Sequence, residues 1–385
     1  MKFIFMVFVL LFFLIPHVAF ATTNPLDVAN NKYGIHVIDE HDFPNASNLV
    51  NSSGGDWGYI TLVITDNDRK KDKWQRNFDL LRSLHLIPII RLATHPSGDI
   101  WAAPKTEDAR NWADFLNSLY WVSKNRYVIL FNEPNHATEW GGYISPSEYA
   151  QILTKFSETL KSASKDFFIL PAGLDASAPN GNQTMDEIDF IKSMINTKTN
   201  VFSQIDGWVS HSYPNPGFRG LSSDEGRGTL KTYRWEIEVL KNFGVNYQFP
   251  VFITETGWPH ADGLVQNKSY YSVELIAELL KQASQQIWDD PQIVAITPFI
   301  LNYQSIPFAN FSWTKLGEKD FYPYYYTYKN IPKIAGKPIL NSVFGNFNGF
   351  KINNLITNYS SDLEVFRSHI DLKFFQSLFL RLFKL

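Results

Sequence analysis

Short apolar runs alternate with longer segments of helical periodicity along most of this 385-residue chain, and this alternation constrains the fold more than any other feature. Eight runs have the length and composition of buried strands: 33–38, 58–64, 86–93, 127–131, 167–172, 205–210, 251–254 and 293–300. Helices are expected between them at 72–84, 108–123, 146–164, 186–196, 230–243 and 270–287. Strands that alternate with helices favour a parallel sheet, so the sequence predicts an α/β fold, the (β/α)8 TIM barrel.

The fourth run ends abruptly in polar residues. Residues 126–135 read Arg-Tyr-Val-Ile-Leu-Phe-Asn-Glu-Pro-Asn. Because Pro134 cannot continue the ladder, Glu133 should lie at the exit of the strand, where a carboxylate must be at the rim, paired, or held protonated. Taken alone, this Asn-Glu pair is better explained as the cap of a loop or helix.

The seventh run repeats the pattern. Residues 250–259 read Pro-Val-Phe-Ile-Thr-Glu-Thr-Gly-Trp-Pro, so an apolar run reaches a carboxylate at Glu255 before Gly257 and Pro259 break the strand. In a TIM barrel the carboxyl ends of all strands meet at one mouth, so Glu133 and Glu255 should face one central cavity. Paired carboxylates in one cleft are the groups that split a glycosidic bond.

Composition narrows the possible partners. The net charge is -3 with no long run of one sign, which argues against nucleic acid. The absence of cysteine excludes thiol nucleophiles, disulfides and thiolate metal sites. No Gly-rich phosphate loop and no pair of histidines at ligand spacing occurs, so we expect neither a cofactor nor a metal. A monomer is expected.

The two ends of the chain differ from the expected catalytic domain at 22–334. Residues 1–21 predict a signal peptide, with Lys2, an apolar run and Ala19-Phe20-Ala21 at the cleavage site, which implies a secreted or cell-surface protein. An uncleaved membrane anchor is the alternative. Residues 335–385 form a C-terminal extension of unknown role, whose basic apolar end at 372–385 could rest on a membrane surface, pack on the barrel or be disordered.

With both glutamates placed, the chain resembles the clan A glycoside hydrolases, retaining barrel enzymes that carry an acid on strand four and a nucleophile on strand seven. Asn132-Glu133-Pro134 resembles their strand-four motif, which implies Glu133 as acid/base and Asn132 as the partner of the sugar 2-hydroxyl. Ile-Thr-Glu-Thr-Gly-Trp at 253–258 resembles their strand-seven motif, which implies Glu255 as the nucleophile.

A third motif follows the sixth run. His211-Ser212-Tyr213 is similar to the His-X-Tyr of cellulase-like family 5, which implies that Tyr213 hydrogen bonds to the nucleophile and that His211 lies in the site. Family 17 β-1,3-glucanases resemble the chain at Glu-Thr-Gly-Trp-Pro, and the cellulase-like and family 39 β-xylosidase-like enzymes resemble it at Asn-Glu-Pro-Asn. The resemblance therefore leaves the sugar and the linkage open.

Two features of family 5 are missing from the chain. No arginine ends the second run and no tryptophan ends the eighth, so Arg91 on the third run is expected to supply a polar contact and Phe299 or Tyr303 a sugar platform. Further candidates for stacking on sugar rings, each with a structural role as the alternative, are Trp101, Trp140 and Trp258.

The chemistry of two carboxylates supports these roles without the resemblance. Neighbouring carboxylates do not ionise equally, so Glu133 should hold a proton for the leaving group while Glu255 stays charged and attacks the anomeric carbon. A retaining enzyme holds the two about 5 to 5.5 Å apart. The sequence thus predicts a secreted retaining β-glycoside hydrolase acting on a β-linked polysaccharide or oligosaccharide. The alternatives are a non-catalytic carbohydrate-binding barrel at the cell surface and a metal-dependent barrel hydrolase.

Overall fold

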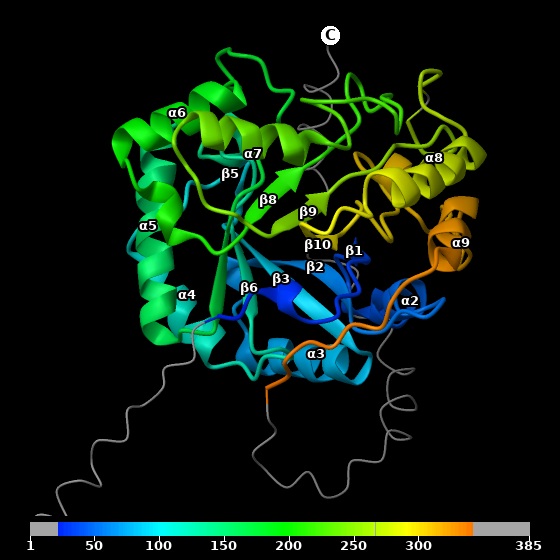
Figure 1. Ribbon diagram of the computed structural model, residues 1–385, viewed down its shortest axis with the longest axis horizontal. Helices are drawn as coiled ribbons and strands as arrows, with labels where there is room; N and C mark the ends of the chain where they lie inside the picture. The colour runs from blue at the N-terminus through cyan, green and yellow to red at the C-terminus, as the bar shows by residue number, and fades with distance from the viewer. Residues whose placement is uncertain (1–21, 266, 342–385) are drawn as a thin grey trace, which may run out of the picture.

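The computed structural model describes residues 22–265 and 267–341, which form a (β/α)8 barrel (Figure 1). Its parallel ladders run in the order β1-β2-β3-β6-β7 and β10-β9-β8. The barrel strands are β1 (Gly34–His36), β2 (Gly58–Thr65), β3 (Leu86–Ala93), β6 (Arg126–Leu130), β7 (Phe167–Pro171), β8 (Trp208–His211), β9 (Val251–Glu255) and β10 (Ile293–Ile296). Each of the eight expected runs overlaps one of them, so the predicted fold class is confirmed.

The two ladders meet at two seams. At the first, Tyr33 pairs in parallel with Ile296, which joins β1 to β10. At the second, Asp206 bridges β7 and β8: its N–H donates to the carbonyl of Ile169 at 2.8 Å, and its carboxylate accepts from the N–H of Ile169 at 2.7 Å. The strands therefore follow one another around the barrel in chain order.

Helices form a ring around the strands (Figure 1). They are α2 (Phe43–Val50), α3 (Lys71–Ser83), α4 (Asp108–Asn117), α5 (Pro146–Ala163), α6 (Glu187–Thr197), α7 (Thr232–Asn242), α8 (Val273–Gln286) and α9 (Pro323–Asn330). Two of these, α2 and α9, were not predicted, because both are short and consist mainly of weak helix formers. Burial of Tyr324, Tyr325 and Tyr328 holds α9 in place instead.

Several predicted boundaries were wrong. The eighth run continues to residue 300 in the sequence, but β10 ends at Ile296, and the sixth run was placed three residues early. The helix predicted at 108–123 was likewise too long, because α4 ends at Asn117. Apolar residues such as Trp121 and Ile300 are fully buried beyond these ends without belonging to a helix or strand, so hydrophobicity alone does not mark the boundary.

Both faces of the strands are buried, as continuous apolar runs predict. One set of side chains packs against the surrounding helices in the larger core. The other fills the barrel interior and consists of Tyr59, Ile87, Ile89, Tyr127, Ile129, Phe168, Leu170, Val209, Phe252, Val294 and Ala295. The interior is therefore a packed core, and any site must lie at one of its two ends.

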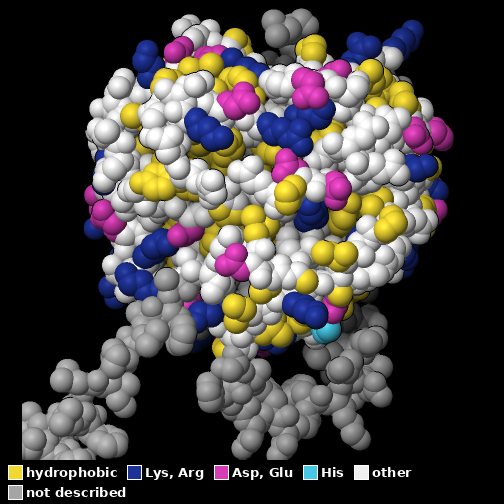
Figure 2. Space-filling view, viewed as in Figure 1, with side chains coloured by type: hydrophobic (Ala, Val, Ile, Leu, Met, Phe, Trp, Pro, Cys, Tyr) yellow, Lys and Arg dark blue, Asp and Glu magenta, His cyan; other side chains and the backbone are white. Residues whose placement is uncertain are grey.

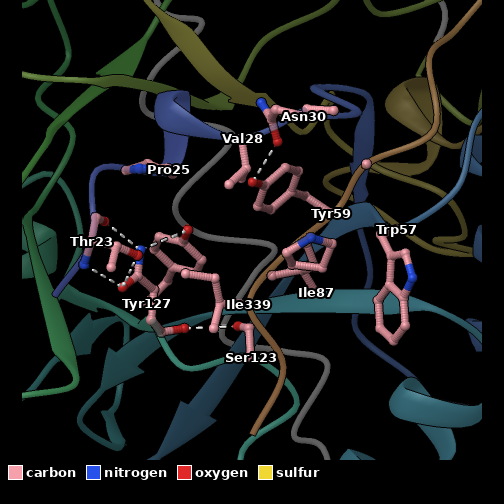
Figure 3. A pocket seen from close by; sticks show the side chains of 14 residues that line it. Thr23, Pro25, Val28, Asn30, Trp57, Tyr59, Ile87, Ser123, Tyr127 and Ile339 are labelled. Atoms are coloured by element: carbon pink, nitrogen blue, oxygen red, sulfur yellow. Dashed lines mark hydrogen bonds between the residues drawn. The ribbon is translucent and has the colours of Figure 1, made fainter. Parts of the chain in front are cut away.

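The amino-terminal end of the barrel is closed by both ends of the described chain. The N–H of Lys337 donates to the carbonyl of Ala29 at 2.7 Å, and the N–H of Lys124 donates to that of Ile339 at 2.7 Å. Figure 3 looks into a cavity of about 30 Å³ at this end, lined in part by Tyr59 and Tyr127. This volume holds a water molecule or two and not a sugar ring.

Other predictions for the chain ends lie outside the described residues. These are the signal peptide at 1–21 and the membrane-surface stretch at 372–385. The expected extension does begin with a segment, 335–341, that contacts the barrel. Within residues 22–265 and 267–341, no helix combines the length and apolar character needed to cross a bilayer.

Two carboxyl groups are buried together between the helices α6 and α7 and the strand β8. Glu187 on α6 and Glu236 on α7 are both fully buried, and Glu236 accepts a hydrogen bond from the indole N–H of Trp208 at 2.9 Å. Burial raises the pKa of Glu187, and the neighbouring charge of Glu236 raises it further. Burial also raises the pKa of Glu236. The pair therefore holds a proton in the folded chain at a pH where the unfolded chain has released it.

We expect Glu187→Gln to stabilise the protein at neutral and alkaline pH. The wild-type folded state keeps a proton that the unfolded state loses above about pH 4.3, so the free energy of unfolding falls as the pH rises from there. The amide of glutamine does not titrate, so the variant avoids this loss of stability. Urea titrations should show a free energy of unfolding about 1 to 3 kcal/mol higher than that of wild type at pH 8, and no difference below pH 4. Glu238→Gln, on the exposed side of α7, is the control and should change nothing. A gain of equal size at both pH values would contradict a shared proton.

Candidate active site

Glu133 and Glu255 face each other at the carboxyl end of the barrel. Glu255 is the last residue of β9, and Glu133 follows the end of β6. One oxygen of each carboxylate and a ring nitrogen of His211 all lie within 4.8 Å of one another. The side chains remain partly accessible, with 22% of Glu133 and 12% of Glu255 exposed. The structure thus brings together the two glutamates that the sequence singled out.

The backbone that carries Glu133 has an unusual conformation. Phe131 has a φ of 73° and Glu133 a φ of 29°, in the left-handed region that side chains rarely adopt. The N–H of Glu133 donates to the carbonyl of Gly173 at 3.1 Å, and the N–H of His136 donates to that of Glu133 at 2.8 Å. Such strain persists only where surrounding contacts enforce it, and it is common at functional sites.

Donors surround Glu255 on both of its oxygens. The Arg91 guanidinium donates to Oε1 at 3.1 Å, and the Tyr213 hydroxyl donates to Oε2 at 3.1 Å. Burial alone would raise the pKa of Glu255, but the positive charges of His211 and Arg91 lower it below its ordinary value. Glu255 is therefore ionised at neutral pH, and Tyr213 makes the contact that the resemblance implies.

His211 links the acid/base candidate to this network. Its Nδ1 lies 2.7 Å from Oε1 of Glu133, and 3.9 Å from Oε2 of Glu255. The ladder between β8 and β9 shifts register between Ser210 and His211, and such bulges re-aim side chains. Burial would lower the pKa of His211, but the charge of Glu255 and the hydrogen bond to Glu133 raise it. When protonated, Nδ1 of His211 can therefore donate to Glu133.

Arg91 connects Glu255 to Asn132, the residue that precedes Glu133. Arg91 lies on β3 and also donates, through Nη1, to the side-chain oxygen of Asn132. This contact fixes the orientation of the amide, because only the oxygen can accept from a guanidinium. The amide nitrogen of Asn132 therefore keeps both of its N–H groups for other acceptors.

The prediction that Trp140 and Trp258 stack on sugar rings was wrong. Trp140 is 0% exposed and packs edge-to-face against Phe131 and Tyr149. Trp258 is buried in the main core, and its indole N–H donates to the carbonyl of Gly220 at 2.9 Å. Neither presents a ring face to a ligand, because the apolar surroundings of the catalytic motifs belong to the core. Trp101, in the short strand β5 (Ile100–Trp101), is partly exposed and stays a candidate.

A cluster of aromatic side chains lies on the Glu255 side of the site. The ring of Tyr213 packs at right angles to that of Phe218, with centroids 5.1 Å apart. The cluster also contains the rings of Phe299, Tyr303, Phe308 and Phe311, and the aliphatic Ile300 packs among them. Phe299 is buried while Tyr303 is partly exposed, so Tyr303 is the better placed of the two platform candidates. Their role stays a prediction.

Sequence reasoning missed two residues of the site. His36, the last residue of β1, is fully buried, and burial together with the charge of Arg91 lowers its pKa to about 3. The only signal in the sequence is a polar residue inside the otherwise apolar run 33–38, which was expected to continue past His36. Glu139 lies in the turn Ala137–Glu139, and no sequence pattern marks it.

A metal ion is a chemical alternative for this arrangement. Among the described residues, Glu133, His211 and Glu255 form a group that could hold one. However, both oxygens of Glu255 already accept from Arg91 and Tyr213, and Nδ1 of His211 already lies within hydrogen-bond distance of Glu133. A cation here would also face the guanidinium that already contacts Oε1 of Glu255. The donor set therefore fits proton transfer better than metal binding.

On the molecular face shown in Figure 2, acidic and basic side chains are interspersed, and hydrophobic side chains are scattered between them. No field of one sign dominates this face. The mixed pattern agrees with the small net charge of the chain.

Comparison with known proteins identifies the fold but no family. No protein-family model matches the chain, and neither does any curated protein sequence. A monomeric β-xylosidase from Caulobacter crescentus matches at 13% identity over 84% of this chain and 72% of its own, with a TM-score of 0.51. The protein XacCel5A matches at 12% identity over 80% of this chain and 100% of its own, also with a TM-score of 0.51. An endo-β-1,3-glucanase from Sorangium cellulosum gives a TM-score of 0.47 at 15% identity over 79% of this chain and 98% of its own.

The chain therefore shares its barrel fold with these solved structures. At such low identity the likeness establishes the barrel alone, and function has to be argued from the site.

Proposed function

We propose that this protein is a retaining β-glycoside hydrolase that acts on a β-linked polysaccharide or oligosaccharide. The observation that carries the proposal is the approach of a Glu133 oxygen and a Glu255 oxygen to within 4.8 Å. Retaining enzymes hold their carboxyl groups about 5 to 5.5 Å apart, whereas inverting enzymes need about 6.5 to 9.5 Å to admit a water. The short distance supports direct attack by one carboxylate.

The different surroundings of the two groups support different roles. Glu255 accepts from two donors and is ionised, which suits a nucleophile. Nδ1 of His211 lies 2.7 Å from Oε1 of Glu133, which supports passage of a proton to Glu133 for its role as the acid. In the first step Glu255 attacks the anomeric carbon while Glu133 protonates the leaving oxygen, so the glycosidic bond breaks and a glycosyl ester forms. In the second step Glu133 takes a proton from water, which attacks the same carbon and releases Glu255.

The substrate class is supported by the fold neighbours. One of them is a β-xylosidase, and XacCel5A has also been solved in complex with cellopentaose. Partly exposed aromatic side chains near Glu255 offer surfaces on which sugar rings could stack. We include secretion and a monomeric state in the proposal, on the basis of the predicted signal peptide and of one monomeric neighbour.

The test is hydrolysis of a panel of aryl β-glycosides and β-glucans, followed by proton NMR from the first turnovers. We expect the β-anomer of the product sugar to appear first and then to mutarotate. Initial release of the α-anomer would contradict retention, and binding without turnover would contradict catalysis. Activity should survive EDTA, since the proposal uses no metal, and loss of activity with the chelator would favour the metal-dependent alternative.

A further inference from the structure

His211 packs directly against a glycine to which the proposed mechanism assigns no role. Gly173 is buried and lies two residues after the end of β7. A Cβ atom built on Gly173 would lie 2.3 Å from Cδ2 and 2.5 Å from Nε2 of His211, whereas real Cβ atoms essentially never approach a neighbour to less than 3.0 Å. The imidazole ring therefore occupies the space that a side chain at position 173 would need.

The same glycine also contacts the acid/base candidate. The carbonyl of Gly173 accepts from the N–H of Glu133 at 3.1 Å, and this N–H belongs to a residue with the uncommon φ of 29°. Nδ1 of His211, in turn, lies 2.7 Å from Oε1 of Glu133. Gly173 thus contacts both members of this hydrogen-bonded pair, one through its carbonyl and the other through its lack of a side chain.

The backbone around Gly173 is tied to the loop that follows β6. The N–H of Asp175 donates to the side-chain oxygen of Asn135 at 3.2 Å, and the amide nitrogen of Asn135 donates to the carbonyl of Asp175 at 3.0 Å. Nε2 of His136 lies 2.9 Å from Oδ2 of Asp175. Because these contacts restrain the backbone, a methyl group at position 173 would displace the ring of His211 before it displaced the loop.

Displacement of the ring would affect the two glutamates unequally. The side chain of His211 is 3% exposed, so it has little space into which it can move without losing its contact with Glu133. Its Nδ1 lies 3.9 Å from Oε2 of Glu255, beyond hydrogen-bond distance. Glu255 keeps its own donors, Arg91 and Tyr213, whatever the position of the ring. The contact that depends on Gly173 is therefore the one with the acid/base candidate.

We propose that Gly173 is a positioning residue for general acid catalysis. Its missing side chain lets His211 come close enough to hydrogen bond to Glu133 and orient that carboxyl group toward the leaving oxygen, while its carbonyl holds the backbone of Glu133. The inference rests on the proposed function and adds to it a residue that sets the geometry of the acid. Gly173 acts through His211 and touches none of the reacting atoms.

The test measures kcat/KM of Gly173→Ala on aryl β-glycosides whose leaving groups range from poor to good. With a poor leaving group kcat/KM should fall about 10- to 100-fold, because a misplaced acid donates its proton less well. With an activated phenol as the leaving group, which needs no proton, it should change less than about 3-fold. Gly181→Ala is the matched control, since a Cβ there would meet only the hydroxyl of Thr184, at 4.0 Å, and both substrates should be unaffected.

A double-mutant cycle shows whether the methyl group acts through His211. When Gly173→Ala is added to His211→Ala, it should cost less than about 2-fold on either substrate, because the ring that it displaces is already gone. The double variant should also fold as His211→Ala does, even if the methyl group destabilises the single variant, and circular dichroism with thermal unfolding checks this.

Three results would overturn the role of Gly173. They are equal losses with poor and good leaving groups, the same loss from Gly173→Ala with and without His211, and a double variant that does not fold although His211→Ala does. A wild type that hydrolyses no glycoside would instead overturn the proposed function, and this inference with it.

Discussion

Glu255→Ala is expected to lower kcat on every glycoside by a factor on the order of 10⁵ or more, because it removes the atom that bonds to the anomeric carbon. Arg91, Tyr213 and His211 would remain around the space left by the carboxylate. Little of their effect on rate should survive, because residues that act as a unit in catalysis are strongly non-additive.

A small anion should restore turnover in this variant. Azide or formate can occupy the space of the missing carboxylate and attack the anomeric carbon from the same side, so the product should be the α-anomer. Glu274→Ala, on the exposed face of α8, is the control and should behave as wild type. A residual rate near that of wild type, or a rescued product of β-configuration, would contradict the assignment of Glu255.

Glu133→Ala should fail in a different way. Loss of general acid catalysis should slow hydrolysis of unactivated glycosides by about 10²- to 10⁴-fold, whereas an aryl group with a good leaving oxygen does not need the proton. The glycosyl enzyme should therefore form in a burst and then break down slowly, since no base activates the water. Azide should accelerate that second step and give a product of β-configuration.

This contrast depends on the different surroundings of the two glutamates. If both alanine variants lost activity equally on activated and unactivated substrates, and azide rescued neither, the two roles could not be separated. If azide gave the α-anomer with Glu133→Ala and the β-anomer with Glu255→Ala, the roles would be exchanged.

The sequence predicted the strands of the barrel well, because they follow from hydrophobic periodicity. It also predicted the positions of Glu133 and Glu255, because both follow the end of an apolar run. Continuous apolar runs between helical segments indicate parallel strands covered by helices, and eight such runs match a barrel, so each run could be placed. A carboxylate that directly follows such a run has to emerge at the barrel mouth, which located Glu133 and Glu255 before any geometry was known.

What the sequence could not supply depends on packing in three dimensions. Trp140 and Trp258 lie next to the motifs, yet they are buried, because residues adjacent in sequence to a catalytic group can point into the core. Glu139 reaches the site only through a turn fixed by Asn135 and by contacts more than 40 residues away. The side-chain bridge of Asp206 at the β7 and β8 seam likewise has no local signature.

The central claim is that Glu255 forms a covalent bond to the sugar, and trapping that bond tests it most directly. A 2-deoxy-2-fluoro β-glycosyl fluoride slows both steps but has a leaving group good enough to allow the first, so the glycosyl enzyme accumulates. The gluco, xylo and manno forms would be incubated with the protein, and the intact mass and the digested peptides measured. With whichever of the three sugars the protein accepts as a substrate, we expect one fluorosugar per chain, attached to Glu255. Attachment to another residue, or steady consumption of the fluoride with no labelled protein, would contradict the account.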